Sequence, residues 1–114
     1  MNAKFCGMLG LTMRAGKLAC GEAAAEEAVR GGTAKLLILA ADASGNTEKK
    51  FLNMANYHQI EVIRPGDRHA IGGAIGRAAA VTAAVTDRGL AEQLCRLADF
   101  RNPRHRFIHQ QGIH

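Results

Sequence analysis

The stretch LLILAADASGNTEKKF, residues 36–51, decides the fold. Its first six residues are apolar without a break, which is typical of a central strand covered on both faces. The run stops at Asp42, and small polar residues lead into a segment whose apolar residues have helical spacing. We therefore expect a central strand over residues 36–41 and a helix over residues 47–58.

The junction between these two elements has two interpretations. Its polar side chains can accept hydrogen bonds from the free backbone N–H groups at the start of the helix, which would make it a cap. The four candidates for this role are Asp42, Ser44, Asn46 and Thr47. Alternatively, the helix start also holds an anion, and Lys49 and Lys50 then become candidates for a phosphate contact.

The sequence on either side alternates helices and strands. Apolar spacing, glycines and Pro65 predict helices over residues 3–15, 22–31 and 88–100, and another that begins near Asp67. They predict strands over residues 60–63 and 79–87, while residues 17–21 form a short strand or a turn. Helices that alternate with strands require a sheet covered on both faces, so the fold class is α/β.

Length and charge limit the organisation of the chain. Its 114 residues suit one domain. The formal charge is +5, and residues 101–114 contribute Arg101, Arg104 and Arg106 without any acid. Residues 1–100 then carry 12 basic and 10 acidic groups, net +2. We expect a domain over residues 1–100 and a basic, flexible tail over residues 101–114, and this charge balance favours a polyanionic partner.

Features that the sequence lacks limit the possible compartment and chemistry of the protein. The three cysteines have no paired spacing, which indicates reduced thiols in a cytoplasmic protein. No apolar run is long enough to span a membrane. The glycines of GGAIGR, residues 72–77, do not fit a phosphate-binding loop and are expected to let a helix lie close to the sheet or to let an RNA backbone approach. We expect no catalytic residues, cofactor or metal, and the alternative is an enzyme acting on a phosphorylated small molecule near residues 44–50.

Four pieces of the sequence carry a resemblance to a known family. In order they are LGLTMRAGKLACGE (9–22), AKLLILAADASGNTEKK (34–50), IGGAIGR (71–77) and VTAAVTDRGLAEQL (81–94). Together they resemble bacterial YlxQ-like ribosomal proteins, which belong to the kink-turn RNA-binding superfamily that includes archaeal L-seven-Ae and eukaryotic L-thirty. The resemblance covers about residues 5–95. It implies a three-layer α-β-α sandwich around a small mixed sheet of about four strands, and a non-catalytic protein that binds structured RNA, ribosomal or otherwise kinked or bulged.

The resemblance also implies two RNA-contacting loops. The first carries the family motif G-x-N-E, in which Gly21 fits the glycine and Glu22 follows it. Ala23 and Ala24 replace the asparagine and glutamate, and Glu27 replaces a later lysine. An alanine side chain forms no hydrogen bond to a base, so kink-turn specificity is an open question for this chain. The second loop precedes Ile71-Gly72 and comprises Ile63, Arg64, Pro65, Gly66, Asp67 and Arg68.

The expected RNA-contacting set joins both loops to nearby bases. It consists of Lys17, Gly21, Glu22, Arg30, Ile63, Arg64, Pro65, Gly66, Asp67, Arg68 and Arg77, with Arg14 and the tail arginines as further phosphate contacts. The main alternative is a protein-interaction or scaffold module that has lost specific RNA recognition. The acidic segment GEAAAEE, residues 21–27, motivates this alternative.

Overall fold

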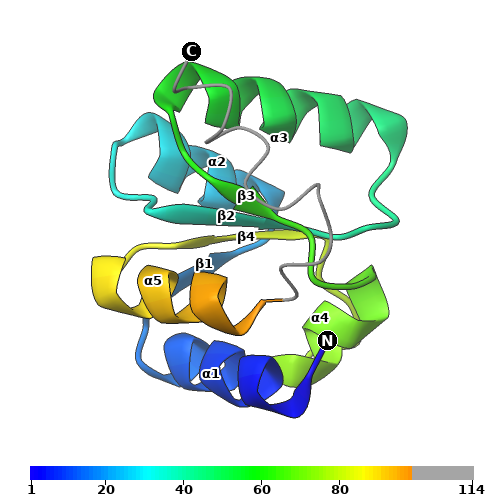
Figure 1. Cartoon of the computed structure of the whole chain (residues 1–114). Coiled ribbons are helices and arrows are strands. Elements are labelled where there is room, and N and C mark those ends of the chain that lie inside the picture. The colour runs from blue at the N-terminus through cyan, green and yellow to red at the C-terminus, as the bar shows by residue number, and fades with distance from the viewer. Residues whose placement is uncertain (99–114) are drawn as a thin grey trace.

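The computed structural model describes residues 1–98 and arranges them as helices on both faces of one sheet (Figure 1). The helices are α1 (Ala3–Arg14), α2 (Glu22–Arg30), α3 (Gly45–His58), α4 (Arg68–Ala74) and α5 (Arg88–Leu97). The strands are β1 (Leu18–Cys20), β2 (Leu36–Leu39), β3 (Val62–Ile63) and β4 (Thr82–Val85). The expected tail over residues 101–114 lies outside the described residues.

The sheet is mixed and has the strand order β1-β4-β2-β3. β4 is antiparallel to both of its neighbours, and β2 is parallel to β3. Helices α2 and α3 cover one face, while α1, α4 and α5 cover the other (Figure 1). The prediction of a three-layer α/β sandwich with about four strands is therefore confirmed.

The central strand is buried on both faces, as its unbroken apolar sequence predicted, but it ends at Leu39, and Ala41 in the predicted range of residues 36–41 is exposed. All four residues of β2 are buried. Leu36 and Ile38 join the core under α1, α4 and α5, whereas Leu37 and Leu39 join the core under α2 and α3. The alternation follows from the two-residue period of a strand, which sends successive side chains to opposite faces.

The helix after the junction begins earlier than expected, at Gly45. The side chain of Ser44 caps it by accepting a hydrogen bond of 3.3 Å from the backbone N–H of Thr47. Ser44 is thus the cap among the four candidates. This confirms the prediction that one of the four supplies the cap, and Asn46 and Thr47 do not fill the role because both already lie in the first helical turn. Asp42 lies before the cap and serves a different contact.

Glycine in GGAIGR permits a close approach, though against a loop and not the sheet. A Cβ atom on Gly72 would lie 2.6 Å from the Cα of Ala79, so α4 can pass against the backbone that leads to β4 only without a side chain there. Gly76 has φ +79°, which turns the chain after α4.

Two smaller findings concern the thiols and the membrane. Cys6, Cys20 and Cys95 are free and half-buried. None of the helices within residues 1–98 has the length and apolar character needed to cross a bilayer.

Candidate functional site

Three loops meet at one edge of the sheet, which we term the loop edge: Gly21, residues 40–44 and residues 64–67. The register places the end of β1 opposite Ala83 and the end of β2 opposite Thr82. β3 ends beside β2 because the two strands are parallel. The backbone N–H of Gly21 also donates to the carbonyl of Thr82 at 3.0 Å. The fold thereby brings both predicted contact loops, distant in sequence, to the same side of the molecule.

The first loop presents a helix start whose N–H groups are free of a side-chain cap. Gly21 precedes α2 with φ +100°, a conformation that side-chain-bearing residues rarely adopt. No side chain among the described residues caps α2, whereas the other described helices are capped by Asn2, Ser44, Asp67 and Asp87. The first N–H groups of α2 therefore remain available to an acceptor at the positive end of the helix dipole.

Arg64 is buried beneath the second loop and anchors it to the neighbouring elements. Its side chain is only 8% exposed, and it forms an ion pair with Glu48 at the start of α3. Its Nη2 also donates to the backbone carbonyl of Ala40 at 2.9 Å. A buried guanidinium requires such partners, and they leave it little access to a ligand on the surface. Ile63 beside it is also buried. In this conformation both side chains pack beneath the loop and stabilise it, and neither is presented to solvent.

Asp42 holds the far end of the same loop through Arg68. Its Oδ1 accepts from the backbone N–H of Arg68 at 2.9 Å, and its Oδ2 accepts from Nε at 3.2 Å. Partial burial alone would raise the pKa of Asp42, but the hydrogen bonds from Arg68 outweigh that effect and the pKa lies below its usual value. The carboxylate therefore stays ionised, and it keeps the half-exposed Arg68 side chain at the loop edge.

The remaining residues of the second loop lie at the surface or close to it. Pro65 and Gly66 are half-buried, and the carbonyl of Gly66 accepts from the backbone N–H of Ala41 at 2.8 Å. Asp67 is exposed, and its Oδ1 caps α4 by accepting from the N–H of residue 70 at 2.8 Å. Arg77 is exposed in the segment that leads to the start of β4, which also lies at the loop edge.

The acids of α2 are used to join α2 to α3. The hydroxyl of Thr47 donates to Glu22 at 3.4 Å. Glu26 accepts from Lys50 at 2.7 Å through one oxygen and from Arg30 at 2.8 Å through the other. The hydrogen bond from Lys50, followed by that from Arg30, lowers the pKa of Glu26. Lys50 and Arg30 thus share one carboxylate.

The two lysines do not lie in the first turn of α3, because the helix begins at Gly45. They occupy its second turn. Lys49 is exposed, and Lys50 is the one that reaches across to α2. A phosphate that these lysines contact would therefore lie on the layer of α2 and α3 and not at the start of α3.

Two predicted contact residues lie away from the loop edge. Lys17 is at the other end of β1, where its carbonyl accepts from the N–H of Thr86 at 2.9 Å. Four residues of extended chain separate it from Gly21 by about 13 Å. Arg30 ends α2, whose first residue lies at the loop edge. The structure therefore groups Gly21, Glu22 and the second loop, but not these two bases.

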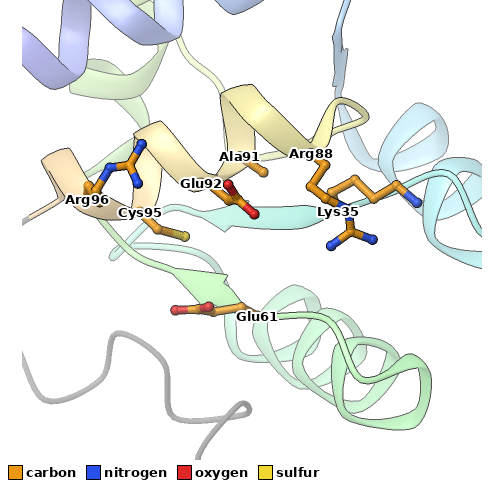
Figure 2. Close-up of a pocket in the computed structure, with 7 residues that line it drawn as sticks. All are labelled: Lys35, Glu61, Arg88, Ala91, Glu92, Cys95 and Arg96. Atoms are coloured by element: carbon orange, nitrogen blue, oxygen red, sulfur yellow. The ribbon is translucent and has the colours of Figure 1, made fainter.

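A groove of about 430 Å³ runs along α5 from Arg88 and Lys35, at the end of the sheet opposite the loop edge, to Arg96 (Figure 2). Helix α5 forms one wall, and the residues that precede β2 and β3 form the other. The lining residues are Lys35, Glu61, Arg88, Ala91, Glu92, Cys95 and Arg96. Their charges are mixed, and the part of the chain that the structure describes contains no cluster of His, Cys, Asp or Glu able to hold a metal ion.

Sequence reasoning missed the structural role of Glu48 and assigned Asp42 to the wrong partner. A buried arginine needs an acidic partner, yet the sequence contains no signal that Arg64 is buried. Asp42 was expected to cap α3, and instead it binds Arg68, 26 positions further along the chain. Such pairs become visible only when the loops that carry them are placed together.

Fold and site together define a class: three-layer α-β-α proteins in which three strand ends and an uncapped helix start form one surface. Residues 3–95 match the model of the family described as Ribosomal protein L7Ae/L30e/S12e/Gadd45. The chain belongs to this family.

Individual relatives agree with this assignment. The chain is 40% identical to the RNA-binding protein YlxQ of Bacillus subtilis over 92 residues, which cover 81% of this chain and 92% of that protein. It is 33% identical to the RNA-binding protein YlxQ of Enterococcus faecium, over 79% and 86% of the two chains.

Solved structures share the fold. A Bacillus halodurans protein of unknown function superposes with a TM-score of 0.80 at 38% identity, over 84% of this chain and 97% of that one. The Giardia lamblia 15.5kD RNA binding protein superposes with a TM-score of 0.69 at 18% identity, over 82% and 87%.

Proposed function

We propose that this protein binds structured RNA at the loop edge and catalyses no reaction, and that it does so in the cytoplasm. The observation that carries the proposal is the convergence of the uncapped start of α2 with the fastened loop of residues 64–68. Membership of a family named for ribosomal proteins supports it. So do the printed names of the two YlxQ relatives, both of which are RNA-binding proteins.

The chemistry of the loop edge suits an RNA backbone that bends or bulges. The free N–H groups of α2 donate to phosphate or base-edge oxygens. Arg68 and the exposed Arg77 supply charge for phosphates, and the surface around Pro65 and Gly66 accommodates an unpaired nucleotide. In this division phosphate contacts position the protein, and contacts to unpaired bases specify the site.

Selectivity for a kink-turn is expected to be modest. Ala23 and Ala24 occupy the first turn of α2, where the family motif has an amide and a carboxylate, and neither can hydrogen-bond a base. Glu27 adds a negative charge where the family has a lysine. We therefore propose a preference for kinked or bulged RNA, ribosomal RNA included, above a general electrostatic affinity.

A titration at several salt concentrations tests the proposal. Wild type and the Arg68→Ala, Arg77→Ala double variant are titrated with one kink-turn RNA and one straight duplex of equal length. The double variant should bind both more weakly, and its salt dependence should fall by roughly 0.7 to 0.9 log units for each phosphate that an arginine no longer neutralises. Arg88→Ala, at the start of α5 and at the end of the sheet opposite the loop edge, is the matched control and should change neither quantity.

Two results would count against the proposal. Absence of binding to either RNA at low salt would reject it and favour the scaffold alternative. Equal reductions in affinity for the control variant and for the double variant would place the RNA elsewhere on the surface. A further variant tests selectivity: Ala23→Asn, Ala24→Glu and Glu27→Lys together should raise the affinity for the kink-turn RNA relative to the duplex.

A further inference from the structure

A second candidate surface runs along the seam between α2 and α3. The two helices run in the same direction away from the loop edge. Thr47 reaches Glu22 at their starts, and Lys50 reaches Glu26 one turn later. Towards their ends they flank an open groove of about 640 Å³ lined by Arg30, Lys50, Asn53, Met54, Tyr57 and His58. We term this surface the seam face.

Tyr57 leaves its ring in solvent on the seam face. Its exposed fraction is 82%, whereas Phe5 and Phe51, the other Phe, Tyr or Trp residues within 1–98, are 1% and 0% exposed. His58 packs against the tyrosine ring in a T-shaped contact with 5.0 Å between centroids. The ring gains little from burial and offers a flat face to a stacking partner.

Cations lie in the same groove as this ring. Arg30 at the end of α2 and Lys50 on α3 both line the groove. Lys49 and Asn53 precede Tyr57 by eight and four positions on α3, so the three side chains form one row along the helix. Glu26 accepts from both cations, which holds them together and offsets one of their charges. An exposed aromatic ring in a groove that also holds cations matches the chemistry by which proteins hold unpaired nucleotides.

We propose that the seam face binds a single-stranded RNA segment that continues from the loop edge. Tyr57 stacks on an unpaired base, and Arg30 and Lys50 contact phosphates, exchanging their bonds to Glu26 for bonds to the RNA. The distance from Ser44 to Tyr57 along α3 is about 20 Å. A stacked strand rises about 3.4 Å per nucleotide, so an extension of about six nucleotides is long enough to span this distance even when its bases stay stacked. The inference rests on the proposed function and adds a substrate feature to it, the single-stranded extension.

The test compares one bulged RNA hairpin with the same hairpin carrying a six-nucleotide single-stranded extension. Wild type should bind the extended RNA more tightly. Tyr57→Ala should remove between about fivefold and about a hundredfold of affinity for the extended RNA, the range of one stacked base, and leave binding of the plain hairpin unchanged. Tyr57→Phe keeps the ring and should retain the advantage. Leu11→Ala is the control, because Leu11 is an exposed apolar residue on α1 in the opposite layer.

A second readout follows the ring itself. The sequence contains one tyrosine and no tryptophan, so the tyrosine emission of the full chain reports on Tyr57 alone. Stacking should quench this emission when the extended RNA is added, and the plain hairpin should leave it nearly constant.

The outcomes separate this inference from the proposed function. If both RNAs bind equally well, Tyr57→Ala has no effect and the emission stays constant, the seam face does not hold RNA and the loop-edge proposal still stands. A protein partner on this face would give that same result. If neither RNA binds at low salt, the proposed function fails and the inference fails with it.

Discussion

Two polar side chains of the junction have different roles: one caps the helix and the other holds the loop. Ser44 satisfies an N–H group at the start of α3, while Asp42, two residues earlier, satisfies the N–H and guanidinium of Arg68. The difference follows from position, since only the residue directly before the helix can reach its free N–H groups. The junction therefore caps one element and fixes another.

Replacing the cap tests the first of these roles. Ser44→Ala should lower the free energy of unfolding by about 1 kcal/mol, because a helix-start N–H loses its acceptor. Chemical denaturation measures the change. Asn46→Ala is the control, since Asn46 is exposed inside the first turn and its replacement should be nearly neutral. Equal changes for the two variants would show that Ser44 is not the stabilising cap.

The contact between Asp42 and Arg68 should depend on pH. The pKa of Asp42 lies below its usual 3.8 in the folded protein, so the ionised carboxylate stabilises the fold. That contribution is complete above pH 3.8 and is lost as the pH falls through the lower folded value. Wild type should thus be more stable than Asp42→Asn at neutral pH, and the difference should shrink in acid.

Denaturation of both proteins across this pH range measures the difference. In an Arg68→Met background the same comparison should show a weaker dependence on pH that does not vanish, because the guanidinium is gone while the backbone N–H of residue 68 still donates to the carboxylate. A pH dependence that persists undiminished in that background would assign the effect to other groups.

At the level of elements, one ion pair joins β3 to α3. Arg64 follows β3 directly and Glu48 lies in the first part of α3, so their contact ties the end of an edge strand to a neighbouring helix. β3 contains only two residues, so few backbone hydrogen bonds can hold it to the neighbouring strand. The position of the second contact loop therefore depends on this side-chain pair as well as on strand pairing.

Removal of Glu48 tests this dependence. Glu48→Ala leaves the Arg64 guanidinium buried with carbonyl acceptors alone, and it should cost about 1 to 3 kcal/mol of stability. Arg64→Met in the same background should recover part of that stability, because an apolar side chain of similar length replaces the uncompensated charge. A double-mutant cycle measured by denaturation gives the coupling, and strictly additive effects would contradict the structural role of the pair.

At the level of the whole molecule, the charge at the loop edge is largely balanced. Asp42 and Glu48 each neutralise an arginine there, so rigid geometry rather than excess charge characterises this site. The sequence places additional positive charge in residues 101–114, outside the described residues. We propose that this segment adds to the general affinity for RNA that Arg68 and Arg77 provide, and that selectivity resides at the loop edge.

Neutralising the three tail arginines tests this division. The Arg101→Ala, Arg104→Ala, Arg106→Ala variant should bind kinked and straight RNA more weakly by the same factor. Its salt dependence should fall by roughly 0.7 to 0.9 log units for each phosphate that the tail no longer neutralises. Filter binding at several salt concentrations measures both quantities, and thermal unfolding should be unchanged. A weakening confined to the kinked RNA would assign the tail a part in selectivity.

The spacing of apolar residues along the chain was enough to predict the elements and their layering. The apolar run of residues 36–41 predicted β2 and its burial on both faces, and the alternation of helices and strands predicted the sandwich. These features depend on the spacing of apolar residues within one segment, which can be read without knowing how the rest of the chain folds. Even so, Gly45 and not Thr47 begins α3, because several polar residues in a row can each serve as the cap.

Which residues share a site became apparent only from the folded chain. The strand order β1-β4-β2-β3 brings Gly21 and Arg68 to one edge and leaves Lys17 at the other end of β1. It also buries Arg64 against Glu48. Nothing in the sequence distinguishes this arginine from the exposed ones. The physical reason is that burial and ion pairing depend on the neighbours in space, and strand order brings those neighbours from distant parts of the chain.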